Sequence, residues 1–383
     1  MAQDVDPNAD KILPEIPPLS PQPKPIDNGD RNTTIAPPGV AVPTQEKIPI
    51  KVKMPPVVWN DTQEVLKSIN TKLGGAVVTY FTRGSIVSDD VKYFYSHLKT
   101  IGHQEKLFFI ITSRGGDGMS AYRIASLLKK FCDELIIVVP EVAASAATML
   151  SLAGDKIIMS SFSYLTAVDT SIVHPLNPLD VDKKPVRIEL EEIKRSVSAL
   201  SSTFKADESQ SKVYETIFSY LHPAAFGALE RASNLSEMLC KDILSLRKNP
   251  PSEEEASVLI NKLNKEYPSH GYPIVPDKAQ SLGLPVELAD EETNNLLWSL
   301  INFYRYITEP VRTDFNDSSF HSEQYMNVIE SVGRRLGVKN VLERRLDPII
   351  KNWTTLRNDF VWEALFEKEE NGEKKLIKSN LNF

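Results

Sequence analysis

The chain has 383 residues, a formal net charge of −7, 41% hydrophobic residues and 25% charged residues. These values are ordinary for a soluble globular protein with two domains, or with one large domain and appendages. The acidic balance argues against a nucleic-acid binder, which usually carries a basic patch. Cys132 and Cys240 are too few for a disulfide framework and are interpreted as reduced thiols of a cytoplasmic protein. No apolar run reaches the length of a membrane span, and the N-terminus lacks the pattern of a secretory signal.

The first 57 residues differ in composition from the rest of the chain. Thirteen of the 26 prolines fall there, and the aliphatic residues are isolated. Such a segment cannot bury enough apolar surface to offset the entropy that is lost when it becomes ordered. The sequence therefore predicts an extended or disordered arm over residues 1–57, which either stays free or docks on a neighbouring subunit or a partner.

Strand and helix patterns alternate from Trp59 onward. Apolar runs typical of buried strands occupy residues 75–81, 106–112, 134–140 and 156–159. Helical patterns precede or follow these runs over residues 60–73, 89–101, 118–131 and 145–153. This alternation predicts an α/β domain with a mostly parallel sheet and crossover helices, which we place over residues 58–290.

The second half of the chain has mainly helical patterns. Helices are predicted over residues 188–204, 214–221, 224–245 and 252–266. From residue 291 onward the pattern indicates further helices separated by polar turns. The last predicted unit is therefore a helical C-terminal extension over residues 291–383.

Two loops carry residues that suit acyl transfer. Gly115 and Gly116 follow one predicted strand, and Ser145, flanked by alanines, follows the next. The carboxyl ends of parallel strands meet at one edge of a sheet, where such sheets bind ligands. A nucleophile needs small neighbours, and glycines let backbone N–H groups approach a developing oxyanion. The pattern favours Ser145 as a nucleophile, with Gly115, Gly116 and Ala146 as candidates for the oxyanion hole.

Each of these features also has a simpler interpretation. A serine between a strand and a helix is most often only an N-cap, and a Gly-Gly turn is most often only a tight turn. The glycines lack the spacing of a P-loop or of a dinucleotide fingerprint. Asp117 and His222 are interpreted as residues that begin helices.

These segments resemble the serine dehydrogenase proteinase family, whose relatives include signal peptide peptidase A and the Clp protease. Residues 111–118 are similar to the Pro-Gly-Gly loop of the family, and residues 139–148 are similar to its Ser-Ala-Gly nucleophile segment. The resemblance extends over residues 75–335, and its most specific part is the block over residues 113–174.

The resemblance implies a Clp/crotonase-like fold and peptide-bond hydrolysis through an acyl-enzyme on Ser145. It implies a peptide or unfolded protein as substrate and assembly as a homo-oligomer. It implies neither a metal nor an organic cofactor. Two positions depart from the family pattern, since Arg114 replaces the usual proline and Ala147 the usual glycine after the nucleophile. The expected oxyanion donors are backbone groups, so these changes leave them in place.

The general base is the least defined part of the site. Clp-type proteases carry a histidine on the strand after the serine, whereas this chain has Asp169 in that vicinity and His174 slightly later. This difference favours the serine–lysine chemistry of the signal-peptide-peptidase branch. Lys194 is the predicted base, because it lies on an amphipathic helix near where the related lysine-dependent enzymes carry theirs.

Other bases stay open. A lysine acts as a base only when burial or a neighbouring cation lowers its pKa, and Lys183 and Lys184 are the alternative lysines. If the base is a histidine, His174 and His270 are the candidates. Asp169 is expected to support the site by accepting hydrogen bonds from loop amides.

Two other functions compete with peptide hydrolysis. A catalytically silent scaffold or interaction protein with the same fold is supported by Arg114 and by the lack of an obvious base. A crotonase-like enzyme that acts on an acyl-coenzyme A would use the same oxyanion loops without a nucleophilic serine. The alanine-flanked Ser145 argues against that second alternative.

Overall fold

The computed structural model describes residues 59–168, 171–172, 174–186, 188–203, 209–308, 311–315, 318–370 and 373–381. These residues belong to one unit over Ile48–Phe383. The predicted arm over residues 1–57 lies outside the described residues.

A ten-stranded sheet forms the centre of this unit. Its order is β14-β13-β12-β11-β1-β2-β3-β5-β9, and β10 pairs with β11. The parallel part consists of β1 (Ala76–Thr82), β2 (Gln104–Thr112), β3 (Cys132–Val139), β5 (Lys156–Met159) and β9 (Val286–Leu288). β1, β2 and β3 are largely buried because helices cover both faces, which is why their sequences are nearly continuous apolar runs. The predicted α/β class with a parallel sheet is confirmed.

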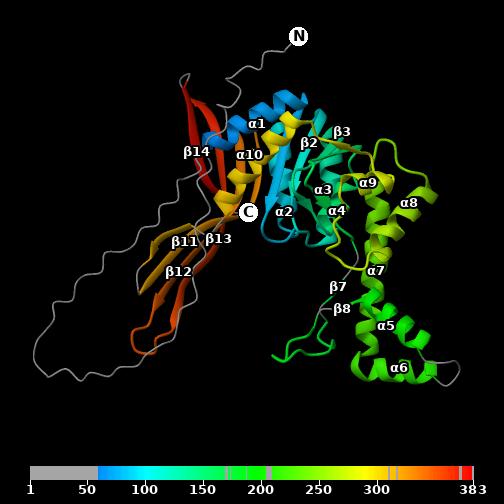
Figure 1. Ribbon diagram of the computed structural model, residues 1–383. Helices are drawn as coiled ribbons and strands as arrows, with labels where there is room; N and C mark the ends of the chain where they lie inside the picture. The colour runs from blue at the N-terminus through cyan, green and yellow to red at the C-terminus, as the bar shows by residue number, and fades with distance from the viewer. Residues whose placement is uncertain are drawn as a thin grey trace, which may run out of the picture. The chain divides into compact units, whose positions relative to one another are not determined.

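Helices pack on both faces of the parallel strands (Figure 1). On one face, α1 (Trp59–Leu73) and α10 (Glu291–Thr308) share a buried apolar cluster with β1, β2 and β3. On the other face, a larger cluster joins the sheet to α2 (Asp90–Ile101), α3 (Gly118–Lys130) and α4 (Ala146–Ser151). This two-sided core fixes the carboxyl ends of β2 and β3, from which the two predicted site loops emerge.

Apart from β5, the chain between β3 and β9 forms helices and short strands outside the main sheet. Two small pairings, β4 (Val142–Ala143) with β6 (Tyr164–Leu165) and β7 (Ser171–Ile172) with β8 (Ile188–Glu189), lie outside the main sheet. The helices are α5 (Leu190–Thr203), α6 (Ser209–Tyr220), α7 (Pro223–Leu244), α8 (Glu253–Asn261), a π-helix (Lys262–Glu266) and α9 (Pro276–Ser281). His222 begins α7 as predicted, since its Nδ1 accepts a hydrogen bond from the Ala224 N–H at 3.1 Å.

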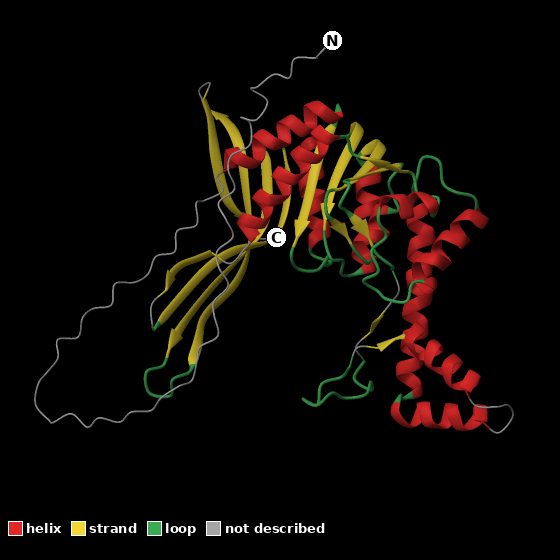
Figure 2. Cartoon of the chain, in the orientation of Figure 1, coloured by secondary structure: helices red, strands yellow, loops and turns green. Residues whose placement is uncertain are grey.

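The predicted helical extension after residue 291 is right for α10 and wrong beyond it. The chain continues as β10 (Val311–Phe315), β11 (Ser319–Ser331), β12 (Arg334–Leu346), β13 (Trp353–Glu370) and β14 (Glu373–Leu381). β11 pairs antiparallel with β1, so this part completes the central sheet (Figure 2). Glu residues, which favour a helix, are common in β13, but Trp362, Ala364 and Phe366 lie on one face of the strand and pack against the core. Packing of that apolar face overrides the local helix propensity.

A buried ion pair joins α1 to the antiparallel strands. Arg335 Nε lies 3.1 Å from Glu330 Oε2, and both side chains are almost completely buried. Glu330 Oε1 also accepts hydrogen bonds from Thr62 Oγ1 and Gln63 Nε2, each at 2.7 Å. The Arg335 guanidinium lies over the Trp59 ring. Both charges are removed from water, so each one depends on its partner and on the surrounding hydrogen bonds to offset the cost of its burial.

His97 on α2 should make stability depend on pH. Its ring is buried, and Nε2 lies 2.9 Å from Ser331 Oγ. Burial first, and then the positive charge of Arg334, lower the pKa of His97 from 6.5 to about 3. As the pH falls, the unfolded chain therefore binds a proton on His97 before the folded chain does. The free energy of unfolding keeps its full value above about pH 6.5 and decreases as the pH drops toward 3, by about 1.4 kcal/mol per pH unit.

Urea unfolding at pH 7 and pH 5 measures this dependence. Wild type should lose about 2 kcal/mol more than His97→Gln between the two pH values. An equal loss in both proteins would show that His97 does not carry the dependence.

Both cysteines are buried free thiols. Burial raises the pKa of Cys132 and of Cys240 to about 12. Since the thiolate is the reactive form, both side chains behave as inert core residues.

None of the helices in the described part of the chain is both long enough and apolar enough to cross a membrane.

Candidate active site

Ser145 connects β4 to α4 in a backbone conformation that residues with a side chain rarely adopt. Its φ is 51° and its ψ is −117°. Such a conformation costs about 1–3 kcal/mol and persists where the surrounding structure imposes it, often at functional sites. Although Ser145 is the N-cap residue of α4, its side chain makes no capping hydrogen bond. The interpretation of this serine as an ordinary N-cap is therefore wrong, and its hydroxyl is left for other contacts.

Two buried threonines hold Ser145 in place. The Ser145 N–H donates to Thr166 Oγ1 at 2.9 Å, and the Thr166 N–H donates to Thr148 Oγ1 at 3.1 Å. Thr148 Oγ1 in turn donates to the Ala143 carbonyl at 2.6 Å. Sequence reasoning missed both threonines, because the Ser145–Thr166 contact spans 21 positions and no local pattern marks it.

The glycine loop packs directly against Ser145. Gly115 and Gly116 have φ values of 102° and 145°, where a side chain is strained. A Cβ on Gly115 would lie 2.8 Å from Ser145 Cβ, and a Cβ on Gly116 would collide with the backbone of Ile86. The Ile86 N–H donates to the Gly115 carbonyl at 2.8 Å, which fixes the loop to the segment after β1. Only glycine at these two positions lets the loop backbone come this close to Ser145 and Ile86. The structure therefore brings the two predicted loops together.

The predicted oxyanion donors differ in what they contact. The Gly115 N–H donates to Ser113 Oγ at 3.1 Å, so this group already has an acceptor. Within the described residues, the N–H groups of Gly116 and Ala146 donate to no acceptor. Gly115 therefore provides the close approach of the backbone, while Gly116 and Ala146 keep unused donors beside Ser145.

Ser145 lines a cavity of about 580 Å³. Gly116 and Ala146 line it too, and His270, which follows the π-helix in the chain, reaches the same cavity. The remaining lining residues are mostly apolar and come from five parts of the chain: Ser85, Ile86, Val87, Arg114, Asp117, Gly118, Met119, Met149, Val168, Ala232, Leu235, Ser236 and Leu239. Asp117 begins α3 as predicted, since its carboxylate accepts from the Ser120 N–H at 2.9 Å.

Lys194, the predicted base, is not among the residues that line this cavity. It lies on α5, its side chain is 45% exposed, and its Nζ pairs with Glu191 Oε1 at 3.0 Å. Lys183 and Lys184 are exposed in a turn that is closed by hydrogen bonds to Asp180. None of the three lysines is therefore brought to Ser145 in the described part of the chain.

The two other predicted residues lie elsewhere or outside the described chain. His174 Nδ1 accepts a hydrogen bond from the Leu176 N–H at 3.2 Å, and His174 does not line the cavity. Asp169 lies outside the described residues. Of the candidate bases named from the sequence, His270 is the one that shares the cavity with Ser145.

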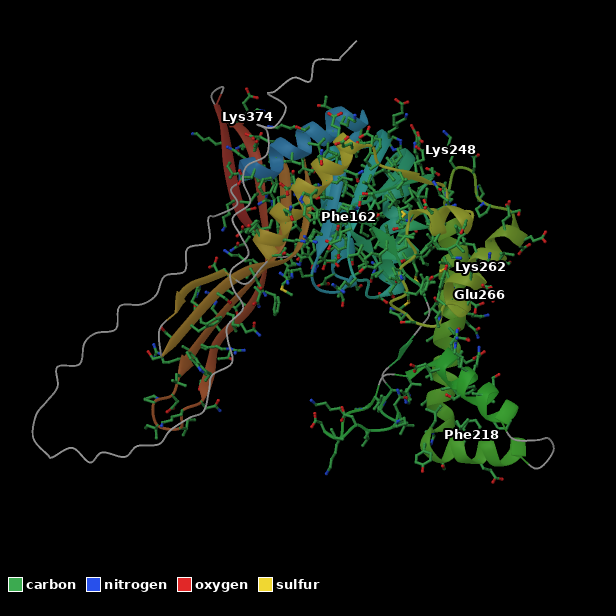
Figure 3. The ribbon with its side chains drawn as sticks, viewed as in Figure 1. Phe162, Phe218, Lys248, Lys262, Glu266 and Lys374 are labelled. Atoms are coloured by element: carbon green, nitrogen blue, oxygen red, sulfur yellow. The ribbon has the colours of Figure 1, made fainter. Side chains whose placement is uncertain are left out.

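A second, smaller cavity of about 270 Å³ lies at the π-helix. Its lining residues are Lys262, Glu266, Tyr267, Lys278, Ser281 and Leu282. Figure 3 labels Lys262 and Glu266, which both come from the π-helical turn. The hydroxyl of Ser281 donates to the Lys278 carbonyl at 2.7 Å, so it is engaged in its own helix. This cavity shares no lining residue with the one at Ser145.

Comparison with known proteins points to one family for the part of the chain that holds the glycine loop and Ser145. Residues 83–221 match a sequence model of the Clp protease family. The matched part contains the glycine loop, Ser145 and Lys194, and it ends before His270. Together with the parallel sheet and its crossover helices, this match shows a Clp-protease-like α/β fold and supports a peptidase-type function.

Two individual proteins are also similar. An uncharacterized protein of Methanocaldococcus jannaschii is 25% identical over 261 residues, which cover 65% of this chain and 79% of that protein. A mutant of the membrane-bound stomatin-specific protease 1510-N is 13% identical, with 58% of this chain and 82% of that chain covered and a TM-score of 0.32.

Proposed function

We propose that this protein is a serine peptidase that cleaves peptide bonds through an acyl-enzyme on Ser145. The observation that supports this most is the strained Ser145, whose side chain makes no cap and faces a loop that only glycine can form. A strained turn from a strand into a helix exposes a nucleophilic oxygen, as in other serine hydrolases. The match to the Clp protease family agrees with this chemistry.

The proposed reaction follows from the donors and acceptors around Ser145. The hydroxyl oxygen attacks the scissile carbonyl as its proton passes to the base, and a tetrahedral oxyanion forms. The N–H groups of Gly116 and Ala146 stabilise that oxyanion, which costs little reorganisation because both are already positioned. The base then gives the proton to the leaving amine, and a water molecule releases the acyl group by the same route in reverse.

We propose His270 as the base in place of Lys194. His270 lines the cavity that contains Ser145, whereas Lys194 is exposed and paired with Glu191. A lysine serves as a base when desolvation or a nearby cation lowers its pKa, and an exposed lysine beside a carboxylate has the opposite surroundings. A histidine needs no such perturbation to accept a proton near neutral pH.

Variants at the two positions distinguish these bases. His270→Ala should lower kcat/KM for a peptide substrate by at least about a hundredfold, because it removes the proton acceptor. Lys194→Ala and Lys194→Arg should keep activity close to wild type, since this side chain lies on the surface. Initial rates of peptide cleavage by the three purified variants and wild type provide the measurement.

An inactive Lys194→Arg together with an active His270→Ala would restore the serine–lysine mechanism that the sequence favours. Thermal melting of each variant provides the control for folding.

We also propose, from the resemblance to the serine dehydrogenase proteinase family, that the protein assembles as a homo-oligomer.

A further inference from the structure

Exposed apolar side chains gather at the turn between β12 and β13. Ile349 and Ile350 are 88% and 67% exposed, and Trp353 and Leu356, at the start of β13, are 37% and 58% exposed. Figure 2 shows this turn as a loop at the end of the two strands. Single exposed apolar residues are common on proteins, but four large ones at one hairpin end suggest an interaction surface. We call residues 344–356 the hairpin tip.

Hydrogen bonds fix the conformation of the hairpin tip. Asp347 Oδ1 accepts from the N–H groups of Ile349 and Ile350 at 2.8 and 3.1 Å. The backbone closes the turn through the Asp347 N–H to the Asn352 carbonyl at 2.9 Å and the Lys351 N–H to the Asp347 carbonyl at 3.0 Å. The two isoleucines are therefore held on the outside of an ordered turn, so a partner would meet them without an ordering cost.

The hairpin tip is also basic, in a chain whose net charge is −7. Arg344, Arg345 and Lys351 are exposed, and within the described residues none of the three forms an ion pair. The single acid of the turn, Asp347, is engaged with backbone amides. Along the strands next to the tip, the charged residues pair with one another: Glu343, Arg357 and Asp359.

We propose that the hairpin tip binds the surface of membranes that contain anionic lipids. Isoleucines at the end of the turn can enter the acyl region, and a tryptophan beside them suits the interface between lipid tails and headgroups. Arginines and a lysine without acidic partners attract anionic headgroups, and this attraction favours a lipid surface over an apolar protein partner. An apolar insertion combined with basic residues is the pairing that gives stable yet reversible attachment. This proposal does not depend on the proposed peptidase activity.

Cosedimentation of the full-length protein with lipid vesicles tests the proposal. One set of vesicles is pure phosphatidylcholine, and the other contains about one-third phosphatidylserine. Wild type should bind the second set more strongly, and added salt should weaken this binding. Replacing both isoleucines, Ile349→Ser with Ile350→Ser, should reduce binding by at least about tenfold. Replacing Arg344, Arg345 and Lys351 by glutamine should remove the preference for the anionic vesicles.

Val181→Ser is the matched control, because Val181 is a fully exposed apolar residue of another turn. This variant should bind vesicles as wild type does, and all variants should keep the wild-type melting temperature, since the changed side chains are exposed. The proposal is wrong if wild type binds neither vesicle type, or if the double isoleucine variant binds as well as wild type. It is also wrong if the isoleucine variant reduces oligomer size while vesicles bind no protein, because the tip would then be a contact between subunits.

Discussion

Replacing Ser145 by alanine should abolish peptide hydrolysis and leave the fold intact. The hydroxyl is the only group that the variant removes, and it makes no capping bond in α4. Stability should therefore change by less than about 1 kcal/mol, which is less than the loss of a true N-cap costs. Peptide cleavage and urea unfolding of the purified variant measure the two effects.

Ser145→Gly is the matched variant for the strained backbone. It should be equally inactive, but it should be about 1 kcal/mol more stable than Ser145→Ala, because glycine adopts a positive φ without a steric cost. Serine is strained in this backbone conformation and glycine would not be, so a catalytic role for the hydroxyl explains why serine occupies the position. Peptide cleavage at the wild-type rate by either variant would exclude Ser145 as the nucleophile.

Replacing Arg335 by leucine should give the largest loss of stability of the substitutions considered. The variant leaves Glu330 charged and buried without its cation, and breaking such a pair costs about 3–5 kcal/mol. Equilibrium urea unfolding at pH 7 measures the loss. The effect should extend beyond the local contact, because the pair joins α1 to β11 and β12.

Arg357→Leu is the control for that substitution. Arg357 lies on the same antiparallel strands and pairs with Asp359 at 2.6 Å, but both side chains are about half exposed. An exposed ion pair contributes at most about 1 kcal/mol, so this variant should remain close to wild type. Equal losses in Arg335→Leu and Arg357→Leu would show that burial of the first pair has little energetic weight.

The parallel half of the sheet was predictable from the sequence because its signals are local. The apolar runs that became β1, β2 and β3 are largely buried on both faces, β5 is buried at Ile157 and Met159, and the helices between them have regular spacing. The two site loops follow from the same reasoning, since parallel strands bring their carboxyl ends to one edge.

The antiparallel half was not predictable in the same way. β13 carries Glu, Leu and Ala residues that favour a helix when judged alone, and its identity as a strand depends on pairing with β12 and β14. Its face with Trp362, Ala364 and Phe366 packs against the core around α2, where Trp362 stacks on Tyr93. The sequence alone does not mark that face, because Val361 and Leu365 between these residues are apolar as well.

The candidate base shows a similar limit for the site. The sequence favoured Lys194 because of its position in an amphipathic helix, but that pattern does not tell whether its side chain faces Ser145 or solvent. His270 follows Ser145 by more than a hundred positions, and only the folded chain brings it to the cavity. Thr166 illustrates the same point, since its hydroxyl supports the Ser145 backbone from a separate loop.

The most direct test of the account is the location of a covalent adduct. The wild-type protein is treated with a fluorophosphonate probe, which reacts with activated serines, and the modified peptide is identified by mass spectrometry. We predict one adduct, on Ser145, that is absent in Ser145→Ala and strongly reduced in His270→Ala. An adduct on a different serine, or no adduct on a folded protein that cleaves peptides, would contradict the assignment of Ser145 as the nucleophile.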